Sequence, residues 1–273
     1  MIPVAMGFLM LTLAALGVFG RMPSFEELEN RKESLATEII SADGVILGKY
    51  YYENRSNVDY DEISPNLVDA LVATEDVRFY EHSGIDFRSL PRVIVGVITF
   101  SPRGGGSTIT QQLAKNLFPR EDRNILQLVW AKLKEWVVAV KLERNYSKDE
   151  IIAMYLNTVF FGNNAYGIKA ASNIFFNKEP IDLTIEESAV LVGVLKAPSL
   201  YNPRTNMERS TNRRNVVLGQ MFKYNYLTQT EYDSLVKLPI NMSHYRRQDH
   251  TTGLAKHYRE MIRSEMTKWC KTH

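Results

Sequence analysis

A helix-start signal recurs along this chain and limits what it can fold into. In this signal a serine or threonine is followed three residues later by a glutamate or glutamine, and each side chain can bond the other's backbone. The pairs are Thr108 with Gln111, Ser147 with Glu150, Thr184 with Glu187, and Thr228 with Glu231. Ser64-Pro65 indicates a further start, since proline is favoured in the first helical turn. The sequence therefore predicts a mainly α-helical protein.

Two segments near the amino end depart from this helical pattern. Met1 to Gly20 contains no charged residue and is long enough to cross a bilayer, so residues 1–21 are predicted to form a transmembrane anchor. Residues 22–62 would follow as a juxtamembrane segment. Within it, Ile39 to Tyr52 alternates around Asp43-Gly44, which is a strong hairpin signal. We therefore expect a small β element before the helices.

Glu75 falls on the apolar side of the helix that should begin at Ser64. The residues that share its face at helical spacing are Val68, Val72 and Phe79. The opposite face, where a surface acid would be expected, carries Asp69, Ala73 and Asp76. A carboxylate placed against apolar neighbours is a candidate for proton transfer. The alternative is a helix-end acid that points into a polar gap.

A glycine-rich loop precedes the helix that should begin at Thr108. Gly104 to Gly106 allow a close ligand approach, and a helix start beside them would attract phosphate. Lys115 would add positive charge two turns later. Neutral partners for sugar or phosphate oxygen are the hydroxyls of Ser107, Thr108 and Thr110 and the amides of Gln111 and Gln112. The alternative is a flexible loop before an ordinary capped helix; a nucleotide P-loop is excluded, since no lysine follows the last glycine.

A long helix packed on the core is predicted from Ile125 to Arg144, where apolar residues recur at helical spacing. They are Leu126, Val129, Trp130, Leu133, Trp136, Val137 and Val140. On this helix Lys132 and Glu135 share a face at i, i+3. Either they form a surface ion pair of little energetic consequence, or they place a carboxylate and an ammonium beside the same cleft.

Five segments, in this order, resemble the motifs of the peptidoglycan glycosyltransferases. The segments are ATEDVRFYEHSGID (Ala73 to Asp86), GGSTITQQLAKNLF (Gly105 to Phe118), KLKEW (Lys132 to Trp136), Tyr146 to Ser172, and Glu187 to Leu218. These membrane-anchored enzymes polymerise lipid II into glycan strands, alone or as the amino-terminal half of class A penicillin-binding proteins. The resemblance implies a lysozyme-like glycosyltransferase domain over residues 63–240, and a linker over residues 241–273 toward an absent carboxy-terminal domain.

The resemblance also implies a mechanism. Glu75 matches the general base that takes the proton from the 4-hydroxyl of the acceptor GlcNAc as it attacks C1 of the donor MurNAc. The donor is α-linked to undecaprenyl pyrophosphate and the product is β-1,4-linked, so a single inverting displacement is implied. Glu135 matches a second catalytic acid that organises the pyrophosphate, either through Lys132 or through a divalent cation such as Mg²⁺. Lys115 matches a lysine that contacts phosphate.

The remaining implied substrate contacts are spread over the matching motifs. They are Asp76, Phe79, His82, Gly106, Ser107, Thr108, Thr110, Gln111, Gln112, Lys132, Tyr155 and Asn157. No residue is assigned as a metal ligand, and the resemblance leaves open whether a divalent cation is required. The spacing between Phe118 and Glu135 is longer than usual for the family, so the match of a family arginine to Arg123 also stays open.

Partners and location follow from the same resemblance. The implied partners are lipid II, the growing glycan strand, the membrane, and proteins of wall synthesis or division. The net charge of +2 gives no sign of nucleic-acid binding, although Arg213 and Arg214 suit an anionic substrate. The apolar segment Pro91 to Pro102 is either core or part of the family's membrane-touching jaw. The catalytic domain is expected outside the bacterial cytoplasmic membrane, behind a single-pass anchor.

Two other functions compete with this interpretation. A lysozyme-like glycan-cleaving enzyme could use the same fold and a lone glutamate, and a non-catalytic scaffold of wall synthesis would need neither acid. Longer glycans made from lipid II, or shorter fragments released from sacculi, would separate the two enzymes. Ser234 and Lys237 have the spacing of a penicillin-binding transpeptidase, but no Lys-Thr-Gly follows them.

Overall fold

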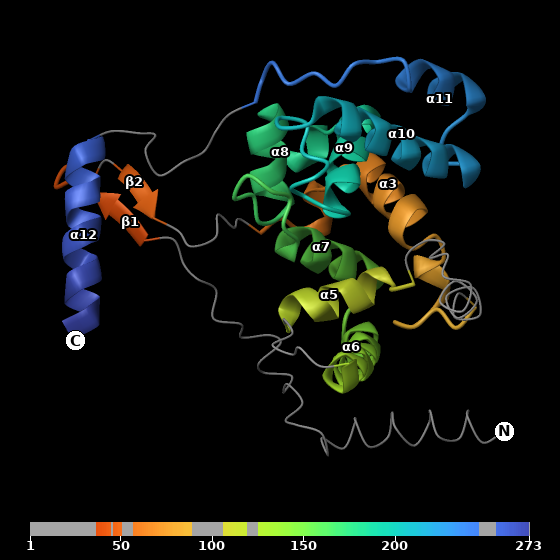
Figure 1. The fold of residues 1–273 in the computed structure, drawn as a ribbon, viewed down its shortest axis with the longest axis horizontal. Coiled ribbons are helices and arrows are strands. Elements are labelled where there is room, and N and C mark those ends of the chain that lie inside the picture. The colour runs from red at the N-terminus through yellow and green to blue at the C-terminus, as the bar shows by residue number, and fades with distance from the viewer. Residues whose placement is uncertain are drawn as a thin grey trace.

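The computed structural model describes residues 37–44, 46–50, 57–88, 106–118, 125–245 and 255–272, and it is mainly helical, as predicted (Figure 1). The predicted anchor at residues 1–21, the apolar segment Pro91 to Pro102, and Arg123 lie outside the described residues. Within those ranges, no helix has the length and apolar character needed to span a bilayer.

The elements before and after the helical body are a hairpin and a final helix. Strands β1 (Thr37–Ile40) and β2 (Ile46–Tyr50) pair antiparallel, which confirms the predicted hairpin. Its turn uses Gly44 at φ 82°, a left-handed conformation that glycine adopts at little cost. Helix α12 (Lys256–Thr272) lies within residues 241–273, whose role as a linker stays a prediction.

The helical body lies between these two elements in the sequence. In chain order its elements are η1 (Tyr60–Glu62), α3 (Pro65–Glu75), η2 (Phe79–Glu81), α5 (Ile109–Leu117), α6 (Ile125–Asn145), α7 (Lys148–Thr158), α8 (Ile168–Phe176), η3 (Pro180–Asp182), α9 (Ile185–Leu195), α10 (Met207–Lys223) and α11 (Gln229–Leu235). All five predicted helix starts are confirmed. Reciprocal capping bonds form between Ser147 and Glu150 and between Thr228 and Glu231.

Two groups of helices meet at the site. Helices α3, α9 and α10 pack against one another, and α5 packs against both α6 and α7. Leu71 of α3 and Leu191 of α9 are fully buried in the first group, and Leu113 of α5 is fully buried in the second. The groups are joined where α3 ends and α5 begins, because the Asp76 carboxylate accepts a hydrogen bond from the Ile109 amide.

Helix α6 confirms the predicted long helix, but it buries a different face from the one predicted. The buried side chains described on it are Ala131, Glu135, Val138, Ala139 and Leu142. The predicted core residues Leu133, Trp136, Val137 and Val140 are only half-buried. The reason is that the backbone at Gly84 packs closely against α6. A Cβ atom on residue 84 would lie only 2.9 Å from the Ala139 carbonyl. Small side chains are needed on that face, and the spacing of large apolar residues could not show it.

Candidate active site

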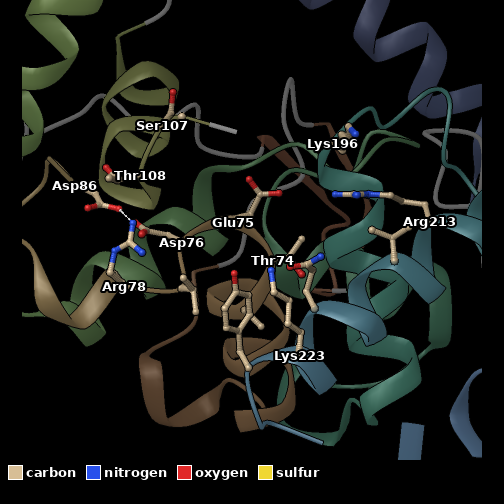
Figure 2. Close-up of a pocket in the computed structure, with 16 residues that line it drawn as sticks. Thr74, Glu75, Asp76, Arg78, Asp86, Ser107, Thr108, Lys196, Arg213 and Lys223 are labelled. Carbon is tan, nitrogen blue, oxygen red and sulfur yellow. Dashed lines mark hydrogen bonds and ion pairs between the residues drawn. The ribbon is translucent and has the colours of Figure 1, made fainter. Parts of the chain in front are cut away.

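Glu75 is the last residue of α3 and points into the space between the helices (Figure 2). Two adjoining cavities meet there, and both linings contain Glu75, Gly106, Ser107 and Lys196. The α10 cavity, of about 410 Å³, is further lined by residues that include Arg78, Asp86, Arg213, Gln220 and Lys223. The α6 cavity, of about 360 Å³, is further lined by residues that include Gln112, Lys115, Lys132 and Glu135. Glu75 therefore faces both cavities.

A chain of two hydrogen bonds holds the Glu75 carboxylate. Gln112 Nε2 donates to Glu75 Oε2 at 2.8 Å, and the Tyr155 hydroxyl donates to Gln112 Oε1 at 3.0 Å. Burial, and then the charge of Glu75, raise the pKa of Tyr155, so this hydroxyl stays a donor. Glu75 is only half-buried, whereas Ala73 and Asp76, assigned to the opposite face, are buried. The structure therefore fits the alternative, a helix-end acid that points into a polar gap, better than an acid on the apolar stripe.

The second acid, Glu135, is buried beside a lysine. Its side chain is 6% exposed, and its Oε2 lies 3.0 Å from Lys132 Nζ, which also donates to Ser107 Oγ at 2.8 Å. The interpretation of this pair as a surface ion pair is therefore wrong. The exposed Lys115 lines the same cavity, so the structure brings together two ammonium groups and a carboxylate on one side of Glu75.

The amino end of α5 already holds an anion of the protein itself. Asp76, 7% exposed, accepts from the Ile109 amide at 3.1 Å and from His82 Nε2 at 3.0 Å. His82 Nδ1 accepts from the Gly84 amide at 3.2 Å, so Nε2 is the ring nitrogen that carries the hydrogen. The prediction that this helix start attracts phosphate is wrong for the Ile109 amide, because the Asp76 carboxylate occupies it.

Three of the predicted sugar-binding side chains hold the loop at Gly84 or the neighbouring helix. The Thr108 hydroxyl donates to the Gly84 carbonyl at 2.8 Å, and Gln111 Nε2 donates to the same carbonyl at 3.2 Å. The Thr110 hydroxyl donates to Glu143 Oε1 at 2.6 Å. All three side chains are buried, and Thr110 lines neither cavity. Thr108 lines the α10 cavity and Gln111 lines the α6 cavity, so their assignment as substrate contacts stays a prediction. Local spacing showed their polarity but not these distant partners.

Other predicted contacts lie behind the cavities. Phe79 is fully buried in the core beneath Lys148 Nζ, which lies 4.3 Å from the ring centroid. Asn157 bonds both the amide and the carbonyl of Val58, at 3.1 and 2.9 Å. Neither residue lines either of the two cavities, nor do His82 and Tyr155. Their side chains support the site in this structure, and their role as substrate contacts stays a prediction.

Several cavity residues were missed by sequence reasoning. Arg78 and Asp86 form an ion pair at 2.5 Å across the α10 cavity lining. Burial opposes ionisation of Asp86, but the bond and charge of Arg78 outweigh it and lower the pKa of that carboxyl. Of the two arginines noted in the sequence, Arg213 lines this cavity, whereas Arg214 is fully buried and donates to the Leu238 and Val236 carbonyls. Two adjacent arginines gave no local signal to tell them apart.

The described part of the chain contains no cluster of side chains suited to bind a divalent cation. No group of three His, Cys, Asp or Glu side chains that could hold a metal occurs there. Glu135, the acid nearest to that role, already accepts from Lys132. The described residues therefore do not by themselves form a site for a protein-held metal ion.

Comparison with known proteins places the chain in a family. A sequence model of the transglycosylase family matches residues 43–222. The chain belongs to the transglycosylase family. The resemblance to the glycosyltransferase domain of class A penicillin-binding proteins is confirmed, and so is the prediction of an enzyme of the peptidoglycan glycosyltransferase class.

Individual relatives of this transglycosylase are much longer proteins. Penicillin-binding protein 1A of Escherichia coli (strain K12) is 38% identical over 248 residues, 90% of this chain and 28% of that protein. Penicillin-binding protein 1F of Bacillus subtilis (strain 168) is 43% identical over 197 residues, 72% of this chain and 27% of that protein. A crystal structure of Penicillin-Binding Protein 1A from Haemophilus influenzae is 26% identical, with a TM-score of 0.49 over 87% of this chain and 25% of that one. The chain thus spans less than a third of these relatives.

Proposed function

We propose that this transglycosylase polymerises lipid II into β-1,4-linked glycan strands and releases undecaprenyl pyrophosphate. The observation that carries the proposal is the position of Glu75, held by Gln112 where the two cavities adjoin. A base at such a boundary can reach an acceptor in one cavity and the reacting carbon of a donor in the other.

The reaction is a single displacement with Glu75 as general base. The 4-hydroxyl of the acceptor GlcNAc loses its proton to Glu75 and its oxygen bonds to C1 of the donor MurNAc. The bond from C1 to the pyrophosphate oxygen breaks, and the electron pair leaves with the pyrophosphate. Attack opposite the leaving group inverts the α-linked donor to a β-linked product.

The α6 cavity suits the departing pyrophosphate. Lys115 and Lys132 line it, and Lys132 is held in place by Glu135 and Ser107. Ammonium groups fixed where negative charge develops stabilise the transition state without reorganising during the reaction. Glu135 therefore acts as a positioning acid for Lys132, which agrees with the second-acid role implied by the family motifs.

The domain organisation and location remain part of the proposal. Residues 1–21 would anchor the protein in the bacterial cytoplasmic membrane and residues 22–62 would lead outward to a lysozyme-like catalytic domain at 63–240, with residues 241–273 as a linker. The uncharged run from Met1 to Gly20 supports the anchor. A substrate with a lipid tail is consistent with this location, and wall-synthesis or division proteins would be its neighbours there.

A glycan-cleaving enzyme of similar fold is the rival function, and the α6 cavity disfavours it. Hydrolysis of an uncharged glycosidic bond has no leaving pyrophosphate for Lys115 and Lys132 to bind. The test is incubation of labelled lipid II with the protein in detergent, followed by separation of products by length, beside a parallel incubation with sacculi. Glycan strands longer than the substrate support the proposal. Shorter fragments from sacculi would indicate the rival, and a folded protein that makes neither would indicate a scaffold.

A further inference from the structure

Three cationic side chains line the α9–α10 side of the α10 cavity. Lys196 follows the end of α9, while Arg213 and Lys223 belong to α10. Figure 2 shows all three on the side of Glu75 away from Ser107, with the Arg213 guanidinium extended toward Glu75. These three residues, Lys196, Arg213 and Lys223, are called the cationic wall. Arg213 and Lys223 line the α10 cavity alone, whereas Lys196 also lines the α6 cavity with Lys115 and Lys132.

The positive charge of the cationic wall is not balanced within the cavity. Asp76 is held by His82 and the Ile109 amide, and Asp86 is paired with Arg78. Among the residues that the structure describes, no acid forms an ion pair with Lys196, Arg213 or Lys223. Three cations therefore face the single remaining carboxylate of Glu75, which leaves room for an anion of a ligand.

Arg213 carries a specific sign of a missing partner. Its Nε is buried and has no hydrogen-bond acceptor in the described part of the protein. A buried charged donor without an acceptor is costly, so such a group calls for one from outside the protein. The backbone of α9 also leaves space for the Arg213 side chain at Gly193. A Cβ atom at this position would lie only 3.2 Å from Arg213 Cγ, so glycine lets the aliphatic part of Arg213 pack directly on the α9 backbone.

The position of Glu75 decides which substrate the cationic wall meets. If the pyrophosphate of the donor leaves through the α6 cavity, the acceptor approaches Glu75 from the α10 cavity. Sugar hydroxyls are neutral and need no cations. The cationic wall therefore matches an oxyanion that the acceptor carries in addition to the attacking sugar, and an arginine fork with two ammonium groups suits phosphate or carboxylate oxygen.

We propose that Arg213, Lys223 and Lys196 form an anion subsite for the acceptor, an inference that rests on the proposed function. The anion is a phosphoryl or carboxylate group on the acceptor molecule. Its two sources are the diphosphate at C1 of the acceptor and the carboxylates of its stem peptide. The subsite makes the enzyme select charged acceptors over neutral disaccharides.

The test is a single coupling between a donor and an acceptor that cannot exchange roles. The donor is lipid II without its GlcNAc 4-hydroxyl; the acceptor keeps that hydroxyl but carries a methylene-linked diphosphate analogue that cannot leave C1. We expect Arg213→Gln and Lys223→Gln each to raise the acceptor KM by roughly tenfold and to leave the donor KM unchanged, since each removes one charge-assisted bond. Lys223 is exposed, so Lys223→Gln should keep the fold. A melting curve checks that Arg213→Gln is folded as well.

Arg209→Gln is the matched control, because Arg209 is an exposed arginine of α10 outside both cavity linings. It should change neither KM. Two further acceptors identify the anion: one with a neutral alkyl group at C1 and an unaltered peptide, the other with the diphosphate analogue and an amidated peptide. With the acceptor that lacks the recognised group, the acceptor KM of Lys223→Gln should equal that of the wild type. This result supports the subsite and identifies the anion.

Variants that raise the donor KM instead, or that affect charged and neutral acceptors alike, would overturn the anion subsite. The proposed function would survive that result as long as the wild type couples the two substrates and Glu75→Gln does not. A wild type that fails to couple them would instead refute the proposed function. The two failures are thus distinguishable in one assay.

Discussion

Gln112 Nε2 lies 2.8 Å from Glu75 Oε2, and the residue that sets the direction of this amide is the buried Tyr155. Because the Tyr155 hydroxyl donates to the amide oxygen, the amide must turn its nitrogen toward the carboxylate. An N–H bonded to a carboxylate stabilises the ionised form, which is the form that accepts a proton. A core tyrosine is thereby connected to the reacting group through one side chain.

Glu75→Gln should abolish polymerisation while leaving the fold intact. The glutamine keeps the shape of a half-buried side chain but cannot accept the proton, and loss of a general base typically lowers a rate by about 10²–10⁴-fold. Product length on gels measures the first effect and a melting curve the second. Substantial turnover by a folded variant would remove Glu75 from the mechanism.

Tyr155→Phe should lower activity by roughly tenfold while the protein stays folded. The variant frees the Gln112 amide to rotate, so the Glu75 carboxylate loses the donor that holds it in place. The rate per folded molecule is measured beside a melting curve. Tyr232→Phe on α11, outside both cavity linings, is the control and should leave the rate unchanged. Lowered stability with an unchanged rate per folded molecule would make Tyr155 a packing residue only.

The local part of this structure was predictable, and the long-range part was not. Capping pairs such as Ser147 with Glu150 lie within one turn, so their residues alone fix a helix start. The partner of the Ile109 amide, Asp76, lies 33 residues away, and nothing near either residue indicates it. For the same reason Thr110 was predicted as a ligand contact, although its partner Glu143 lies on another helix. The candidate acids were predictable because sequence motifs carried them; the neighbours that orient them were not.

Lys132→Met should destabilise the protein by roughly 2 kcal/mol and lower donor use. The change leaves the carboxylate of Glu135, which is 6% exposed, without its ammonium partner; the estimate is below the usual cost of breaking a fully buried pair because Lys132 is 33% exposed. Urea unfolding measures the stability. Adding Glu135→Leu should restore much of the stability without restoring activity, because the buried carboxylate that lost its Lys132 partner is gone but the phosphate-side cation is still absent. Full recovery of both would mean that the pair is structural only.

Asp86→Asn should remove part of the pH dependence of stability. The pKa of Asp86 is lowered from its ordinary value of 3.8, since Arg78 favours the ionised acid more than burial opposes it. A carboxyl with a lowered folded-state pKa contributes stability above its unfolded value, and the contribution is lost as the pH falls through the folded value. The variant should therefore be less stable than the wild type by about 1 kcal/mol at neutral pH, and the two should converge in acid. A constant difference across the acidic range would assign the effect to packing.

Lys115→Ala should raise the donor KM by roughly tenfold and leave the melting temperature unchanged. Lys115 is exposed on α5 and lines the α6 cavity, so its charge can act on a phosphate while its loss removes little packing. The single-coupling assay separates the donor KM from the acceptor KM, and only the former should respond. Lys134→Ala, which removes a charge from α6 outside both cavity linings, is the matched control and should leave both values unchanged. A melting temperature that falls while activity per folded molecule stays constant would show that Lys115 is structural, and the leaving pyrophosphate would then depend on Lys132 and Lys196, which line the same cavity.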